Sequence, residues 1–145
     1  MKYLNPILIG LAVLGTAVSA YLLTVHWGWW NAVCLGVGDC EVVNTSRWSE
    51  LLGIPVALLG GLTYLSLLAF GFAILRDLYG DYARYARFLV AAIGVAFSGY
   101  LTYIELYVIH EICPWCVLSA IIITLTLILS IIEYRQPLAA EPATE

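Results

Sequence analysis

The sequence has little charge. Only 11% of its 145 residues are charged, against about 25% in an average soluble domain, and the few basic residues form no stripe that could bind phosphates. Because 63% of the residues are hydrophobic, a chain of this length could not hide its apolar surface in one aqueous core. The composition therefore excludes an ordinary cytosolic globule, a disordered chain and a nucleic-acid-binding protein, and it indicates a small polytopic membrane protein.

Long uncharged runs dominate the sequence. A helix needs about 20 residues to cross a hydrocarbon layer of roughly 30 Å, and four stretches are long enough: Pro6–Val25, Leu51–Leu75, Phe88–Ile109 and Ile112–Ile132. Backbone amides in lipid must be satisfied within the segment, so helices are predicted. We expect an all-α bundle of four transmembrane helices with spans at about 6–25, 53–76, 86–109 and 113–133. The outer loop, about 26–52, contains cysteines and is expected to carry a short interfacial helix.

The first stretch has an alternative interpretation. Lys2, the apolar run and Val18-Ser19-Ala20 imitate a cleavable signal peptide. The run continues to Val25 and is longer than most signal cores, so we predict that it is retained as a span. Residues 1–135 are then expected to form a single domain, and 136–145, rich in Pro, Ala and Glu, a disordered cytoplasmic tail.

The positive charges predict the orientation. Of the six basic residues, only Arg47 falls in the first outer loop, and the others lie at the N-terminus, in the second connection and in the tail: Lys2, Arg76, Arg84, Arg87 and Arg135. Basic residues mark the cytoplasmic side. We therefore expect an integral membrane protein, in the inner membrane if bacterial, with both termini in the cytoplasm and the first loop outside.

All four cysteines fall on the predicted outer side. Cys113 and Cys116 belong to a Cys-Pro-Trp-Cys stretch at the start of the last span. Pro114 suits the first turn of a helix, so both sulfurs are predicted to lie near unpaired amides and the positive end of the helix dipole. This environment favours thiolate, the attacking species in disulfide exchange. The motif therefore indicates a redox pair at the membrane surface.

The other two cysteines lie six residues apart in the first loop. Two glycines between Cys34 and Cys40 would let this segment fold back and close a short ring. Asp39 is expected to cap a short helix that begins at Cys40. Four cysteines allow three pairings, and the sequence by itself does not choose among them.

Two further interpretations of the cysteines remain open. The four could form two structural disulfides in a non-catalytic membrane adaptor. They could also bind zinc, although a five-residue gap fits a zinc knuckle poorly, and no metal is our prediction. A redox relay accounts best for a Cys-x-x-Cys at the lipid edge, because so tight a ring is easily reduced.

These residues resemble a known family, the vitamin K epoxide reductase homologues. The resemblance covers roughly residues 6–133 and rests on a set of residues in order: Cys34, Cys40, Val43, Ser46, the run Leu52–Ala57, Gly60, Tyr64 and the closing Cys113-x-x-Cys116. The quinone reductase of Dsb type also has four helices and two cysteine pairs. Its Cys-x-x-Cys, however, lies in the first outer loop, which argues against that alternative.

The resemblance implies a thiol:quinone oxidoreductase that supports disulfide formation. Electrons would pass from an extracytoplasmic thioredoxin-like (Dsb-type) protein to Cys34 and Cys40, then to Cys113 and Cys116, and then to menaquinone or ubiquinone. The resemblance makes Cys116 the quinone-facing thiolate. It also implies a transient Cys40–Cys113 bridge, and it matches Ser46 to the serine or threonine of the family's loop helix.

Some positions depart from the family pattern. Animal reductases carry a tyrosine one turn after the second cysteine of the pair, where this chain has Ala120. Their quinone-contacting asparagine is replaced by an apolar residue near Val56. We therefore expect reduction of a quinone, with a naphthoquinone or vitamin K epoxide as the alternative. The chain ends without a fused thioredoxin-like domain, so the partner is expected to act in trans.

Three polar residues near the outer face complete the candidates. Glu105 is the one carboxylate within a predicted span, and it could contact the quinone, with Cys116, Val56 and Ala120, and deliver protons to it. Its shallow depth favours instead a residue that snorkels to the interface. His26 and His110 are likewise expected to be interface residues.

Overall fold

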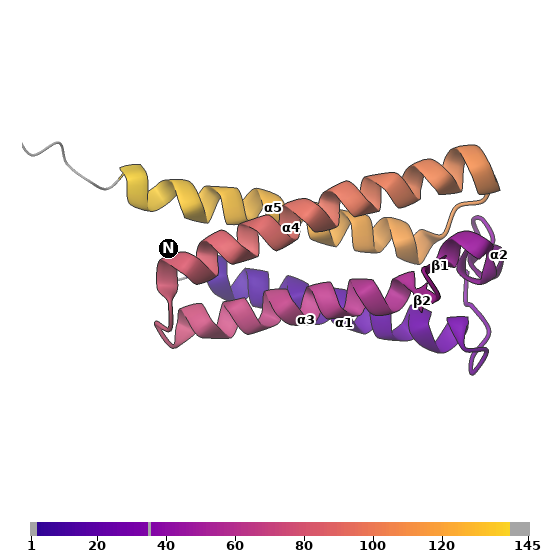
Figure 1. Cartoon of the computed structure of the whole chain (residues 1–145), viewed down its shortest axis with the longest axis horizontal. Helices are drawn as coiled ribbons and strands as arrows, with labels where there is room; N and C mark the ends of the chain where they lie inside the picture. Colours follow the sequence, from indigo (N-terminus) through magenta and orange to yellow (C-terminus); the bar gives the residue numbers. More distant parts are fainter. Residues whose placement is uncertain (1–2, 35, 140–145) are drawn as a thin grey trace, which may run out of the picture.

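The computed structural model describes residues 3–34 and 36–139 and contains the predicted four-helix bundle (Figure 1). The long helices are α1 (Leu4–His26), α3 (Val56–Leu75), α4 (Gly80–Ile104) and α5 (Pro114–Ala139). Each of these four segments of the described chain is long and apolar enough to cross a membrane. The all-α membrane fold is therefore confirmed.

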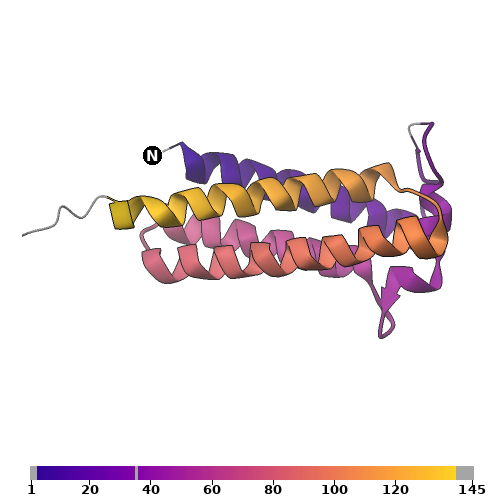
Figure 2. The ribbon, with the colours of Figure 1, turned by 90° about the horizontal axis from the view of Figure 1, so that it is seen from above.

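The helices pack in a closed ring. Helix α1 packs against α3 and α5, and α4 completes the ring between α3 and α5. Figures 1 and 2 show the start of α1 and the end of α5 at one end of the bundle and the loop between α1 and α3 at the other. We call the loop-bearing end the outer end and the opposite one the inner end.

The outer loop carries more structure than one helix. The expected short helix is α2 (Cys40–Thr45), which a 3-10 turn, η1 (Arg47–Ser49), and a hairpin of β1 (Glu50–Leu51) and β2 (Ile54–Pro55) follow. Glu50 pairs with Pro55 and Leu51 with Ile54 in antiparallel register. The hairpin was not predicted, because its apolar residues read as the start of the second span.

Two helices extend by more than two residues beyond their predicted bounds. Helix α4 begins at Gly80 rather than near residue 86, since its first turns already pack on the bundle through the buried Ala83. Helix α5 runs to Ala139, so residues 136–139 of the expected disordered tail are helical. Adding a residue to an existing helix requires no new nucleation. The rest of that tail, 140–145, lies outside the described residues.

The end of α4 is irregular. Its last turn widens into a π-turn, η2 (Glu105–Ile109), which stops at His110 in a left-handed conformation with φ of 61°. A single π-turn at the end of an α-helix re-aims the side chains it carries and is frequent at functional sites. Glu105 is the first residue of this turn.

Close packing between α1 and α3 fixes one wall of the bundle interior. A Cβ atom at Gly15 would overlap the ring of Tyr64, so only glycine allows this approach. The hydroxyl of Tyr64 donates to the carbonyl of Ser119 on α5, at 2.8 Å. Tyr64 thus links three helices in the interior.

A buried polar cluster ties the helices together near the inner end. Arg87 on α4 is 1% exposed, forms an ion pair with Glu133 on α5 and donates to Oδ1 of Asn5 on α1 at 2.6 Å. The Nδ2 of Asn5 in turn donates to the carbonyl of Gly71 on α3, at 3.1 Å. One cation therefore organises contacts to the other three long helices.

Removing this cation is expected to destabilise the bundle strongly. Arg87→Met leaves the Glu133 carboxylate without its partner, and breaking a buried ion pair in this way costs about 3–5 kcal/mol. Thermal unfolding in detergent measures the loss, and Arg87→Met/Glu133→Met should recover most of it. The exposed Arg84–Asp81 pair is the control, since Arg84→Met should cost under about 1 kcal/mol. Equal effects of the two single substitutions would contradict a special role of Arg87.

Candidate active site

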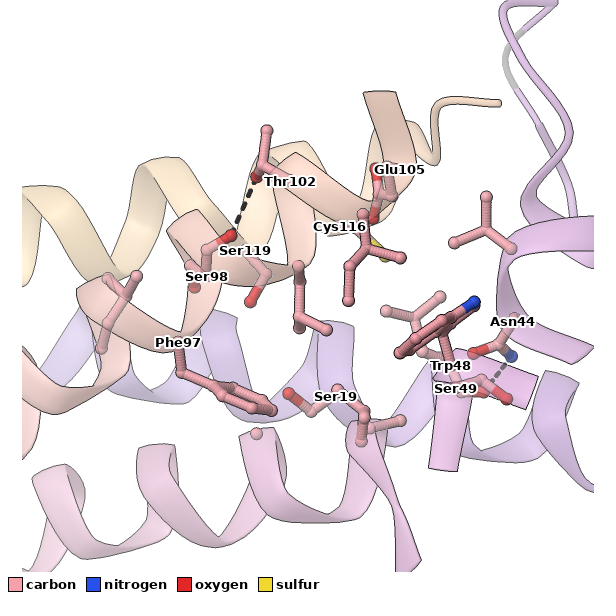
Figure 3. Close-up of a pocket in the computed structure, with 18 of the residues that line it drawn as sticks. Ser19, Asn44, Trp48, Ser49, Phe97, Ser98, Thr102, Glu105, Cys116 and Ser119 are labelled. Carbon is pink, nitrogen blue, oxygen red and sulfur yellow. Dashed lines mark hydrogen bonds between the residues drawn. The ribbon is translucent and has the colours of Figure 1, made fainter. Parts of the chain in front are cut away.

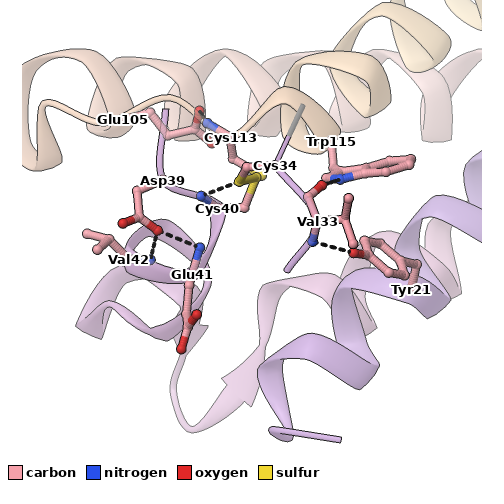
Figure 4. Close-up of a disulfide and its surroundings, with 10 residues drawn as sticks. All are labelled: Tyr21, Val33, Cys34, Asp39, Cys40, Glu41, Val42, Glu105, Cys113 and Trp115. Carbon is pink, nitrogen blue, oxygen red and sulfur yellow. Dashed lines mark hydrogen bonds between the residues drawn. A yellow bond between two sulfur atoms is a disulfide. The ribbon is translucent and has the colours of Figure 1, made fainter. Parts of the chain in front are cut away.

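The two loop cysteines form a disulfide at the start of α2. Asp39 caps this helix as predicted, and its Oδ1 accepts from the amides of Glu41 and Val42, both at 3.1 Å. Cys40 is fully buried, whereas Cys34 is half-buried. The disulfide therefore joins a fully buried residue to a half-buried one (Figure 4).

Two aromatic side chains hold the segment before Cys34. The Val33 amide donates to the hydroxyl of Tyr21 on α1, and Nε1 of Trp115 on α5 donates to the Val33 carbonyl, both at 2.9 Å. The rings of Tyr21 and Trp115 also pack together, with centroids 4.9 Å apart. Trp115 therefore joins the outer loop to the Cys-x-x-Cys helix.

The second cysteine pair lies at the N-terminus of α5 as predicted. Pro114 is the first helical residue, Cys113 precedes it, and both thiols are free. A hydrogen bond from the Cys116 thiol lowers the pKa of the Cys113 thiol, against the opposing effect of burial. This shift favours the thiolate form of Cys113.

The two pairs meet through a tight backbone contact. Gly38 has φ of +72°, and a Cβ atom there would overlap the carbonyl oxygen of Ile112, the residue before Cys113. Cys40 and Cys113 are both fully buried in the same cluster, and Figure 4 shows Cys113 beside the disulfide. The fold therefore brings the two cysteine pairs together at the outer end.

An open pocket with a cavity volume of about 120 Å³ lies beside Cys116, which lines its wall. The walls are mostly apolar, and Figure 3 shows a few polar groups facing the space. Its residues come from all four long helices and the loop and include Ser19, Leu22, Val43, Asn44, Ser46, Val56, Tyr64, Phe97, Ser98, Leu101, Thr102, Glu105, Cys116, Ser119 and Ile123.

Residues 6–131 match the model of the Vitamin K epoxide reductase family. The chain belongs to this family. Membership implies a membrane-bound, quinone-linked thiol oxidoreductase activity in general. The zinc interpretation fails for the loop pair, because the Cys34 and Cys40 sulfurs are bonded to each other.

Of the four quinone contacts expected from the sequence, Cys116, Val56 and Glu105 line the pocket, and Ser46 lines it too. Ala120 is not among the lining residues, and its contact with a quinone stays a prediction. Ser119 and Ile123, three and seven residues after Cys116, line the pocket instead. Ala120 is also one turn from Cys116, so the packing of α5, and not helical spacing alone, decides which residues reach the pocket.

The expectation that Glu105 snorkels to the interface is wrong. Its side chain is 5% exposed, and its Oε2 accepts from the Cys113 amide at 3.4 Å. The first amides of a helix have no partner within it, and the π-turn at the end of α4 supplies this carboxyl group to the start of α5. His110 remains exposed, as an interface residue would be.

Sequence reasoning missed several polar contacts around the pocket. Nδ1 of His26 donates to the Asn44 carbonyl at 2.8 Å, and its Nε2 lies 3.2 Å from a Glu50 oxygen. The Asn44 amide donates to the carbonyl of Leu22 at 2.8 Å. Together these contacts fasten α2 and the hairpin over the end of α1. Nothing in the local pattern of these residues signals the contacts, which join segments far apart in the sequence.

Proposed function

We propose that the protein oxidises an extracytoplasmic thioredoxin-like protein and passes two electrons to a quinone, which supports disulfide formation. One observation carries the proposal: the cysteines form a path from the half-buried Cys34, through the buried Cys40 and Cys113, to Cys116 at the pocket wall. A partner protein in water and an acceptor in lipid need such a path between them.

The order of transfer follows from the exposure of the sulfurs. The partner's dithiol reduces the Cys34–Cys40 disulfide through the more accessible Cys34. The reduced Cys40 then attacks Cys113 of an oxidised Cys113–Cys116 pair, and Cys34 resolves the Cys40–Cys113 bridge. This leaves the loop pair oxidised and the helix pair as thiols. The structure has this combination of bonds, which corresponds to the state ready to reduce a quinone.

The pocket residues fit a quinone. A flat, largely apolar ring suits walls such as Phe97, Leu101 and Val56, while hydroxyls and an amide offer hydrogen bonds at its edge. A bound quinone supplies an acceptor for two electrons and two protons. Cys116 delivers the electrons, because it is the cysteine that lines the pocket. The apolar Val56, where animal reductases carry asparagine, favours a quinone over its epoxide as substrate.

The cysteine-bearing end is proposed to face away from the cytoplasm. Arg76 and Arg84 lie near the inner end of the bundle, in or beside the connection between α3 and α4, and Arg135 lies near the end of α5. Positive residues of this kind stay on the cytoplasmic side. Both termini are then cytoplasmic, and the disulfide lies on the side where disulfides persist.

Purified protein, a reduced thioredoxin-like donor and a panel of quinones test the proposal. We expect donor-dependent loss of quinone absorbance, with one quinone reduced per donor dithiol oxidised, for menaquinone or ubiquinone. Donor whose thiols have been alkylated is the control and should give no reduction. Absence of reduction with every quinone, or reduction of vitamin K epoxide alone, would contradict the proposal.

A further inference from the structure

Glu105 is a buried carboxyl group in direct contact with the second cysteine pair. Its Oε2 accepts from the Cys113 amide at 3.4 Å, and both Glu105 and Cys116 line the pocket. Figure 3 shows Glu105 of η2 and Cys116 of α5 close to each other at the pocket wall. The carboxyl group thus lies beside the residue that is proposed to deliver electrons.

No cation balances this carboxyl group in the part of the chain that the structure describes. The lining residues include no Lys, Arg or His, and none of the ion pairs involves Glu105. A buried carboxylate without a cation is costly, which makes uptake of a proton from a neighbouring acid favourable. Of its neighbours, the Cys113 N–H only donates a hydrogen bond, whereas the Cys116 thiol can give up a proton.

We propose that Glu105 accepts the proton of the Cys116 thiol and transfers it into the pocket as the electrons leave. This inference rests on the proposed function and adds a catalytic residue to it.

The step balances in atoms and electrons. Cys113 and Cys116 together lose two protons and two electrons as the bond between their Sγ atoms forms. Glu105 takes the first proton from Cys116 Sγ and releases it to an oxygen of the quinone. The electron pair passes to the quinone in the same step. The second proton, from the hydrogen-bonded Cys113, follows the same route. Glu105 ends as a carboxylate, and the products are one disulfide and one hydroquinone.

Glu105→Gln separates this role from a structural one. The amide oxygen can still accept from the Cys113 amide, but the side chain no longer takes up a proton. We expect quinone reduction by the pre-reduced protein to slow about 100-fold or more in a single turnover, as for loss of a general base. Glu105→Asp, which keeps the carboxyl group, should recover part of the rate. Glu111→Gln, on the same connection, is the matched control and should react like the unmodified protein.

A second measurement, made without quinone, moves in the opposite direction. A carboxylate beside a thiol opposes thiolate formation, so Glu105→Gln should make Cys116 react about threefold or more faster with iodoacetamide, as located by peptide mass spectrometry. Faster alkylation with slower quinone reduction supports the proposal. An unchanged single-turnover rate, or a parallel fall in both reactions, would overturn it. Failure of the unmodified protein to reduce any quinone would instead overturn the proposed function.

Discussion

Cys116→Ala is expected to abolish quinone reduction, with a loss of about 10³-fold or more, as found when the reacting group of an enzyme is removed. Cys116 is the cysteine that lines the pocket, and no other sulfur among the described lining residues can replace it. The substitution deletes one half-buried sulfur, so the free energy of unfolding should fall by only about 1 kcal/mol. Single-turnover absorbance and thermal unfolding measure the two quantities.

The neighbouring Val117→Ala provides the control for Cys116→Ala. Val117 lies on the same turn of α5 but is 38% exposed and is not part of the pocket wall. It should keep normal turnover. If the Cys116→Ala protein still reduced quinone with a reduced thioredoxin-like donor, the cysteines would be better explained as structural disulfides of a non-catalytic adaptor.

Gly38→Ala is expected to interrupt transfer between the two cysteine pairs. The new Cβ atom would overlap the Ile112 carbonyl oxygen, so the loop must move away from Cys113. A displacement of about 1 Å at a reacting centre can cost about 100-fold in rate. The readout is the Cys40–Cys113 disulfide that forms on mild oxidation in a Cys34→Ser/Cys116→Ser background, followed by mass spectrometry with donor-linked turnover.

Gly36→Ala is the matched control for this clash. Gly36 also has positive φ, +80°, but a Cβ atom there meets nothing within 4 Å. Both variants therefore carry the strain of a left-handed alanine, about 1 kcal/mol, and only Gly38→Ala carries the overlap. Equal rates of Cys40–Cys113 bond formation in the two variants would show that the contact with Ile112 does not position the pairs.

In the outer loop, one local feature could be predicted from the sequence and another could not. Asp39 as the cap of a helix at Cys40 was predictable, because capping is a local interaction between neighbouring residues. The hairpin was not predictable, because its turn residues Leu52 and Gly53 adopt φ values of 55° and 80°. Nothing in this apolar stretch of sequence indicates such a conformation. Leucine is rarely left-handed, and here the pairing of the two flanking strands accompanies that conformation.

Glu105 and Ala120 mark the limit for the candidate site. Glu105 was expected either at the quinone or at the interface, and the structure buries it at the pocket wall. Ala120 was expected at the quinone from its position in a family motif, and it is not among the lining residues. The direction of the Glu105 side chain depends on a π-turn, and the periodicity of the α4 sequence does not predict that turn. The absence of Ala120 from the pocket depends on which face of α5 is turned inward, and that follows from its packing against α1 and α4.

The sequence by itself determined the four membrane helices, the helix caps at Asp39 and Cys113, and the presence of two cysteine pairs. These features follow from local composition and spacing, because a lipid environment requires long apolar helices and a helix end requires partners for its amides. Only the tertiary structure decided that Gly38 rests on Ile112, that Cys40 and Cys113 share one buried cluster, and that Glu105 reaches Cys116. Those contacts join segments many residues apart, and their formation depends on how four helices and a loop pack together.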